Sequence, residues 1–168
     1  MGVHEENRPA LPIKATPYQH QIEAYRFACG LFGLLPGGGN ESGGCALLME
    51  MGTGKTITSI AITGALANAG HIRRVLIVAP LSILGVWEEE FQKFAAFPYA
   101  LAVLSGTGAR KLDTLRHMNG AALQVVVVNY ESAWRLEKDL SAWRPNLIIA
   151  DEGHKIKTHT IAASKALH

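Results

Sequence analysis

The sequence of 168 residues has no long uninterrupted apolar run, and it has only two cysteines. Its apolar stretches, such as residues 75–80 and 125–128, are far shorter than the about 20 residues that a membrane-spanning helix needs. Residues 1–9 are polar and lack the apolar core of a secretory signal. These absences predict a cytoplasmic protein, and the hydrophobic content of 48% suffices for one domain with a core.

An excess of charge of one sign is also absent, because 16 basic and 14 acidic side chains leave a net charge of +2. A balance this close does not indicate a nucleic-acid partner by itself, so such a prediction depends on motifs. Cys29 and Cys45 lie in apolar surroundings without metal-ligand spacing. We therefore expect buried, reduced thiols in place of a disulfide or a metal site.

Short apolar runs alternate with helical segments along most of the chain, after a polar N-terminal tail over residues 1–15. Thr16, Pro17 and Gln19 predict the capped start of a first helix, with Gln19 completing a capping box. Further helices are expected at residues 56–68, 84–94 and 109–118, and strands at residues 45–49, 75–79, 100–104, 125–128 and 147–150. Apolar strands that do not alternate with polar residues favour a doubly wound α/β fold with a parallel sheet.

Residues 49–56, with the sequence Met-Glu-Met-Gly-Thr-Gly-Lys-Thr, follow an expected strand and open an expected helix. This is the context of a phosphate-binding loop, in which glycines let the backbone approach phosphate oxygens. Lys55 is expected to contact the outer phosphates, and the Thr56 hydroxyl to ligate Mg²⁺. The strict pattern has glycine where Met49 stands, but its Gly-x-Gly-Lys-Thr core is present. The predicted nucleotide-binding residues in this loop are Met49, Glu50, Met51, Gly52, Thr53, Gly54, Lys55 and Thr56.

A pair of carboxylates, Asp151 and Glu152, follows the last apolar run. Ligands of open α/β sheets bind at the carboxyl ends of the strands, where this pair is expected to lie. Asp151 is predicted to hold Mg²⁺, and Glu152 to orient and deprotonate an attacking water. Trp87, Phe91 and Phe94 have helical spacing, which favours core packing over stacking on bases.

These motifs together resemble the superfamily 2 helicases and translocases, and within them the Swi/Snf-type DNA-dependent ATPases. The resemblance runs from about Thr16 to the end of the chain, and it implies a RecA-like three-layer P-loop fold. It assigns Gln19 to adenine recognition, which competes with the capping role for the same amide. It also assigns His154 to the coupling of the ATP state to the nucleic-acid site. Its remaining candidates, for contact with a nucleic-acid backbone, are Pro80, Leu81, Ser82, Gly106, Asn129 and Tyr130.

The resemblance implies a lobe that binds and hydrolyses Mg-ATP and couples hydrolysis to translocation on DNA, and the Swi/Snf-type resemblance implies duplex DNA. An RNA helicase lobe, a nucleotide-binding interaction module without catalysis, and a small-molecule kinase are the alternatives. The chain ends before the family's motif III strand and second lobe. We therefore expect an incomplete sheet, a need for that second lobe as a partner, and almost no ATP turnover by residues 1–168 alone, since an arginine finger contributes roughly 10³ to 10⁵ in rate.

Overall fold

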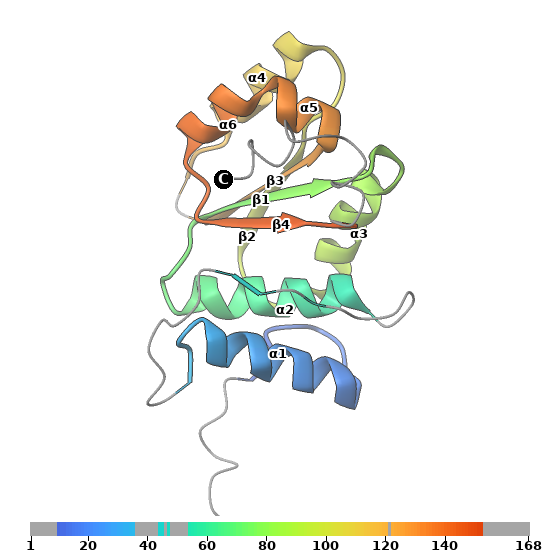
Figure 1. Ribbon diagram of the computed structural model, residues 1–168, viewed down its shortest axis with the longest axis vertical. Coiled ribbons are helices and arrows are strands. Elements are labelled where there is room, and N and C mark those ends of the chain that lie inside the picture. The colour runs from blue at the N-terminus through green and yellow to red at the C-terminus, as the bar shows by residue number, and fades with distance from the viewer. Residues whose placement is uncertain (1–9, 36–43, 46, 48–53, 121, 153–168) are drawn as a thin grey trace, which may run out of the picture. The chain divides into compact units, whose positions relative to one another are not determined.

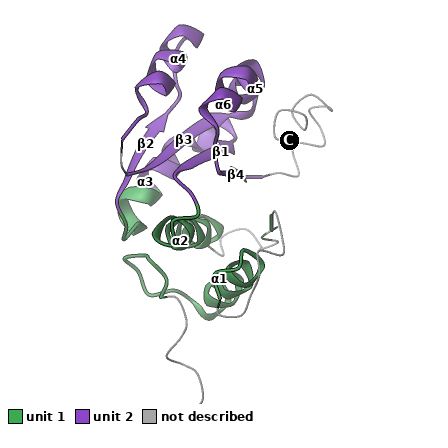
Figure 2. Cartoon of the chain, turned by 90° about the vertical axis from the view of Figure 1, so that its left-hand side faces the viewer, with its two compact units in different colours: residues 1–71, 90–97 green, residues 72–89, 98–168 purple. Residues whose placement is uncertain are grey.

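The computed structural model describes residues 10–35, 44–45, 47, 54–120 and 122–152 (Figure 1). The chain forms two compact units, each considered by itself: residues 1–71 and 90–97 make unit 1, and residues 72–89 and 98–168 make unit 2 (Figure 2). Among the described residues, no helix combines the length and apolarity required to cross a bilayer.

Unit 1 contains two helices that contact each other, α1 (Gln19–Leu31) and α2 (Lys55–Asn68). Tyr25 and Cys29 are fully buried on α1. Both cysteines are free thiols, as predicted, although Cys45 is only partly buried. Burial raises the pKa of the Cys29 thiol, so the neutral form is favoured there.

Residues near the N-terminus are tied to the end of α3 (Leu84–Phe94) within unit 1. Ile13 forms an antiparallel bridge with Ala95, and the Lys14 amide donates to the Phe94 carbonyl at 2.8 Å. These bonds satisfy backbone groups that would otherwise need water. Part of the segment expected to be a polar tail therefore has defined partners.

Unit 2 is built on a sheet of four parallel strands in the order β2-β3-β1-β4. The strands are β1 (Arg74–Ala79), β2 (Tyr99–Val103), β3 (Leu123–Asn129) and β4 (Leu147–Ala150). The connecting elements are η1 (Leu81–Ile83), the first part of α3, α4 (Gly108–His117), α5 (Tyr130–Arg135) and α6 (Glu137–Trp143). Strands and helices alternate along the chain, so the α/β prediction is confirmed.

Helices α4, α5 and α6 cover one face of this sheet (Figure 1). Alternate residues of the two central strands point into this layer, because successive side chains of a strand face opposite sides. The core of this layer consists of Leu76, Val78, Leu104, Leu115, Val126, Val128, Ala133, Leu136, Leu140 and Trp143. Val75, Ile77, Val125 and Val127 have the opposite parity and are also fully buried. Burial on both faces explains why the strands are continuous apolar runs.

Four of the five expected strands are present within one or two residues of their predicted bounds. The fifth, at residues 45–49, falls largely outside the described residues. The expected helix over residues 84–94 has those bounds, and α2 and α4 each begin one residue earlier than predicted.

Candidate functional site

The candidate phosphate-binding region lies in unit 1, at the N-terminus of α2. Gly54 is the N-cap residue and has a left-handed backbone with φ of 80°, which glycine adopts without strain. Lys55 and Thr56 are the first two helical residues. The rest of the expected loop, residues 49–53, lies outside the described residues.

This helix terminus is suited to an anion. Among the described residues, no side chain caps α2, and the first backbone bond within the helix runs from the Thr58 amide to the Gly54 carbonyl. The amides before Thr58 therefore lack intrahelical acceptors and carry the partial positive charge of the helix N-terminus. The first turn has no acidic residue, and it has Lys55. A lysine here opposes the helix dipole unless a negative ligand binds.

Gln21 of α1 contacts this terminus closely, although the sequence interpretation did not select it. Its side chain is 4% exposed, and a Cβ added to Gly54 would lie 2.0 Å from Gln21 Nε2. Only glycine leaves room for this amide at position 54. Gln21 thus links the start of α1 to the start of α2 within unit 1.

The expected capping role of Gln19 is wrong, because α1 begins two residues later than Thr16 and Pro17 predict. Tyr18 is the N-cap, and its amide donates to Gln21 Oε1 at 2.9 Å. Gln21 is the N3 residue, which is the position from which a side chain reaches back to the cap. Gln19 is exposed and its amide donates to Glu23 Oε1 at 3.0 Å, so the adenine role assigned to Gln19 stays a prediction.

The candidate acidic region lies in unit 2, where the four parallel strands end at one edge of the sheet. Ala79 pairs in register with Asn129, and Val78 pairs with Ala150. The segments that follow β1, β3 and β4 therefore emerge side by side, and Asp151 and Glu152 are in the last of them. This edge is where open α/β sheets bind ligands.

Asp151 is fixed by contacts from three elements. Its amide donates to the Val78 carbonyl at 2.9 Å, and its own carbonyl accepts from the Tyr130 hydroxyl at 2.5 Å. The indole Nε1–H of Trp87 donates to Asp151 Oδ2 at 3.0 Å. Both the backbone and the carboxylate are held in place, as expected of a group that must present an oxygen in a defined direction.

Tyr130 is suited to donate the hydroxyl bond to Asp151. Burial raises its pKa to about 12, and the nearby charges of Asp151 and Glu152 act in the same direction. The phenol is therefore protonated at neutral pH.

Glu152 has a left-handed backbone, with φ of 52°. Residues with a Cβ rarely adopt this conformation, and such residues are concentrated at functional sites. His154 and the residues after it lie outside the described residues.

The candidates for nucleic-acid contact occupy the same edge of unit 2. Leu81 is 71% exposed and Ser82 is also exposed in η1, with Pro80 as the N-cap. Gly106 has φ of 82° in the loop after β2. Asn129 caps α5, with Oδ1 accepting from the Ser132 amide at 2.7 Å. Asn129 and Tyr130 thus have structural roles, and their contact with nucleic acid stays a prediction.

Trp87 is the second residue whose role the sequence interpretation missed. The prediction that it packs in the core is correct, as it is for Phe91, since they are 2% and 0% exposed. Phe94 is only partly buried. The indole N–H of Trp87 nevertheless reaches a carboxylate 64 positions away. The spacing of apolar residues along one helix predicts which face is buried, but it does not predict which distant group a polar atom on that face will bind.

Among the described residues, no three His, Cys, Asp or Glu side chains are arranged to enclose a metal ion. Magnesium does not require such a cage, because it commonly binds through one or two protein oxygens together with substrate phosphates and water. Asp151 and Thr56 are oxygen donors of this kind. The chemistry of each residue, considered in its own unit, therefore suits an oxygen ligand of Mg²⁺.

Known proteins resemble this chain over nearly its whole length. The family model of the SNF2-related domain matches residues 13–168. The chain is 27% identical over 177 residues to a RAD54-like DNA repair and recombination protein of Drosophila ananassae, covering 98% of the chain and 22% of that protein. It is 31% identical over 162 residues to the probable ATP-dependent DNA helicase CHR23 of Arabidopsis thaliana, covering 95% of the chain and 14% of that protein.

A solved structure also has this fold. The SWI2/SNF2 ATPase core of Sulfolobus solfataricus in complex with double-stranded DNA aligns with a TM-score of 0.72 and 24% identity, over 96% of this chain and 31% of that one. The chain spans about a fifth or less of the curated relatives named above. Because the family model covers most of the chain, the chain belongs to the SNF2-related domain family.

Proposed function

We propose that the chain is the ATP-binding and hydrolysing lobe of a DNA-dependent motor that couples hydrolysis to translocation on duplex DNA. The observation that carries this proposal is the fixed carboxylate of Asp151 at the strand edge of unit 2. In unit 1, the uncapped α2 terminus with Lys55 and Thr56 supports it. Membership of the SNF2-related domain family supports the proposal.

Each residue has a role that follows from its chemistry. The free amides at the start of α2 and the Lys55 ammonium stabilise phosphate oxygens, and Gln19 contacts the adenine. Thr56 and Asp151 supply oxygen ligands to Mg²⁺. The metal supplies neutralisation of phosphate charge when bound. Glu152 orients a water molecule and accepts its proton.

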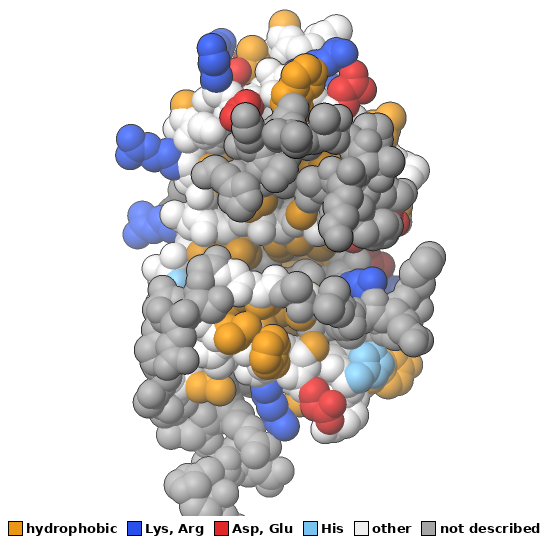
Figure 3. Space-filling model, viewed as in Figure 1, with side chains coloured by type: hydrophobic (Ala, Val, Ile, Leu, Met, Phe, Trp, Pro, Cys, Tyr) orange, Lys and Arg blue, Asp and Glu red, His pale blue; other side chains and the backbone are white. Residues whose placement is uncertain are grey.

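The proposed DNA contact follows from the relatives. One is named a DNA repair and recombination protein, and the SWI2/SNF2 core was solved with double-stranded DNA. The edge of unit 2 presents exposed turns at Leu81 and Gly106 for a sugar–phosphate backbone. On the face shown in Figure 3, Lys and Arg side chains are interspersed with acidic and neutral ones. A weak, sequence-indifferent affinity fits such a surface better than tight binding.

A second RecA-like lobe of a longer protein is the proposed protein partner. The chain covers 14% to 22% of the curated relatives described above, so those proteins contain much more than this region. We propose that such a lobe supplies the arginine that completes the ATPase site, and that His154 takes part in the coupling.

Nucleotide binding is tested with Lys55→Ala. The substitution removes a charged donor to the phosphates, which contributes about 1.5–3 kcal/mol per bond and thus lowers affinity for Mg-ADP by roughly tenfold or more. Titration calorimetry measures this loss. Lys14→Ala is the matched control, because Lys14 is an exposed lysine of the same unit. Equal affinities for the wild type and Lys55→Ala would contradict the proposed phosphate site.

DNA binding is tested through its dependence on salt. Contacts with phosphates release counterions, so the logarithm of the binding constant should fall linearly with the logarithm of salt concentration, by about 0.9 per phosphate contacted. Fluorescence anisotropy with two duplexes of equal length and unrelated sequence measures both slopes. They are expected to coincide. Tight binding to one sequence at high salt would indicate a protein that reads bases.

A further inference from the structure

Trp87 joins a buried helix face to the carboxylate at the strand edge of unit 2. It lies in the first part of α3, is 2% exposed, and its Nε1–H donates to Asp151 Oδ2 at 3.0 Å. A buried indole N–H requires an acceptor, and a carboxylate is a strong one. Aromatic packing alone would be satisfied by phenylalanine. The bond to Asp151 is therefore the property that distinguishes tryptophan here.

The other contacts of Asp151 fix its backbone and not its carboxylate. The Val78 carbonyl and the Tyr130 hydroxyl bind the amide and the carbonyl of Asp151, which sets the position of its Cα. The side chain can still rotate about its own bonds. The Trp87 bond holds Oδ2, and among the described residues no donor contacts Oδ1. The Trp87 bond thus anchors one oxygen of the carboxylate.

We propose that Trp87 is a positioning residue that orients the Asp151 carboxylate toward Mg²⁺ bound with the nucleotide. This inference rests on the proposed function, in which Asp151 holds the metal. Magnesium requires nearly ideal octahedral geometry, so a carboxylate that rotates binds it less well than one held by a second hydrogen bond. Trp87 acts through Asp151 and does not touch the metal.

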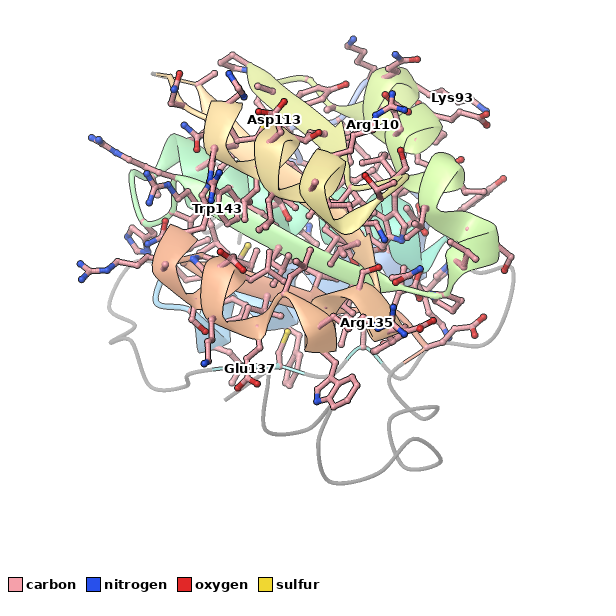
Figure 4. The ribbon with its side chains drawn as sticks, turned by 90° about the horizontal axis from the view of Figure 1, so that it is seen from above. Lys93, Arg110, Asp113, Arg135, Glu137 and Trp143 are labelled. Atoms are coloured by element: carbon pink, nitrogen blue, oxygen red, sulfur yellow. The ribbon has the colours of Figure 1, made fainter. Side chains whose placement is uncertain are left out.

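Trp143 provides a matched control in the same unit. It is also a buried tryptophan, at 8% exposure, and it lies on α6 (Figure 4). Its Nε1 has no hydrogen-bond partner among the described residues. Replacing either tryptophan with phenylalanine removes a similar amount of buried ring. Only Trp87→Phe removes a hydrogen bond to Asp151.

The first measurement is the affinity for ADP by calorimetry, with saturating Mg²⁺ and with chelator, on the full chain. Without metal, we expect Trp87→Phe to bind ADP with the wild-type affinity. The increase in ADP affinity that Mg²⁺ causes should be about tenfold smaller in Trp87→Phe than in the wild type, since hydrogen bonds to metal ligands have effects of this size. Trp143→Phe should keep the wild-type gain. A wild type with no gain from Mg²⁺ would overturn the proposed function and this inference together. A wild-type gain that Trp87→Phe retains would overturn the inference alone.

A second measurement does not require Trp87→Phe to fold. The wild-type ¹H–¹⁵N spectrum contains indole signals from the three tryptophans, and Trp134→Phe and Trp143→Phe assign two of them, leaving that of Trp87. Addition of Mg²⁺ to the ADP-bound chain should move the Trp87 signal and leave the Trp143 signal in place. A Trp87 signal that does not respond to Mg²⁺, while calorimetry shows a gain from the metal, would refute the positioning role.

Discussion

Two glycines at opposite ends of α2 have the same backbone requirement but different surroundings. Gly54 has φ of 80° and Gly70 has φ of 75°, so alanine is strained at both positions by roughly 1–2 kcal/mol. A Cβ at Gly70 would meet open space, whereas a Cβ at Gly54 would lie 2.0 Å from Gln21 Nε2. Gln21 cannot move away without breaking its bond to the Tyr18 amide. Position 54 therefore combines strain with a steric conflict.

We predict that Gly54→Ala lowers the free energy of unfolding by more than Gly70→Ala does. The excess should be about 1 kcal/mol, since relief of the clash breaks the partly buried hydrogen bond between the Tyr18 amide and Gln21. In a Gln21→Ala background, Gly54→Ala should cost about as much as Gly70→Ala, because the clashing amide is gone. Urea denaturation of Gly54→Ala, Gly70→Ala, Gln21→Ala and the double variant of Gln21 and Gly54 measures these differences in the free energy of unfolding. An identical cost of Gly54→Ala in both backgrounds would show that Gln21 does not constrain the loop.

At the scale of single residues, the sequence predicted those whose chemistry is set by local context. Lys55 and Asp151 were selected because each stands next to a turn or strand end that indicates a role, and these roles stay predictions. Gln21 and Trp87 were not, because their partners Gly54 and Asp151 are distant in sequence and meet them only after folding. A glutamine three residues after a possible helix start is the one local signal that could have identified Gln21.

At the scale of elements, hydrophobic periodicity predicted which segments are helices and strands. The capping residues determine where each helix begins. The start of α1 was misplaced because Thr16 and Pro17 are typical of a helix start, yet the cap forms at Tyr18. In α4, the Thr107 side chain accepts from the Arg110 amide and sets the first residue at Gly108. Several residues can compete to begin a helix, and tertiary contacts select among them.

The cap of α5 gives a prediction at this scale. Asn129 Oδ1 accepts from the Ser132 amide, so Asn129→Ala should lower the free energy of unfolding by about 1 kcal/mol. Asn129→Asp keeps the acceptor and should remain near the wild type. Chemical denaturation of the variants measures the difference. If both substitutions cost the same, the Asn129 amide has a role other than capping.

At the scale of the whole molecule, the alternation of strands and helices predicted a parallel sheet, but the order β2-β3-β1-β4 could not be derived from it. Strand order depends on which strands pair, and all four are apolar enough to pair with any other. The strand order matters for the acidic region, because Asp151 directly follows β4, and β4 pairs with β1 on one side. Among the described strands, none pairs with the other side of β4.

The edge of β4 that pairs with no other described strand gives the last prediction. Its backbone donors and acceptors on that side can pair with a strand of another chain, and Ile148 is an exposed apolar residue there at 39%. We expect the chain to self-associate with rising concentration in sedimentation velocity, and Ile148→Lys to weaken this association at least about tenfold, because a charge on an edge strand opposes pairing. Val86→Lys is the control, since Val86 is 45% exposed on a helix of the same unit and gains the same charge. An equal effect of both lysines would mean that net charge, and not the strand edge, governs association, and a wild type that is monomeric at every concentration would show that the β4 edge is already covered.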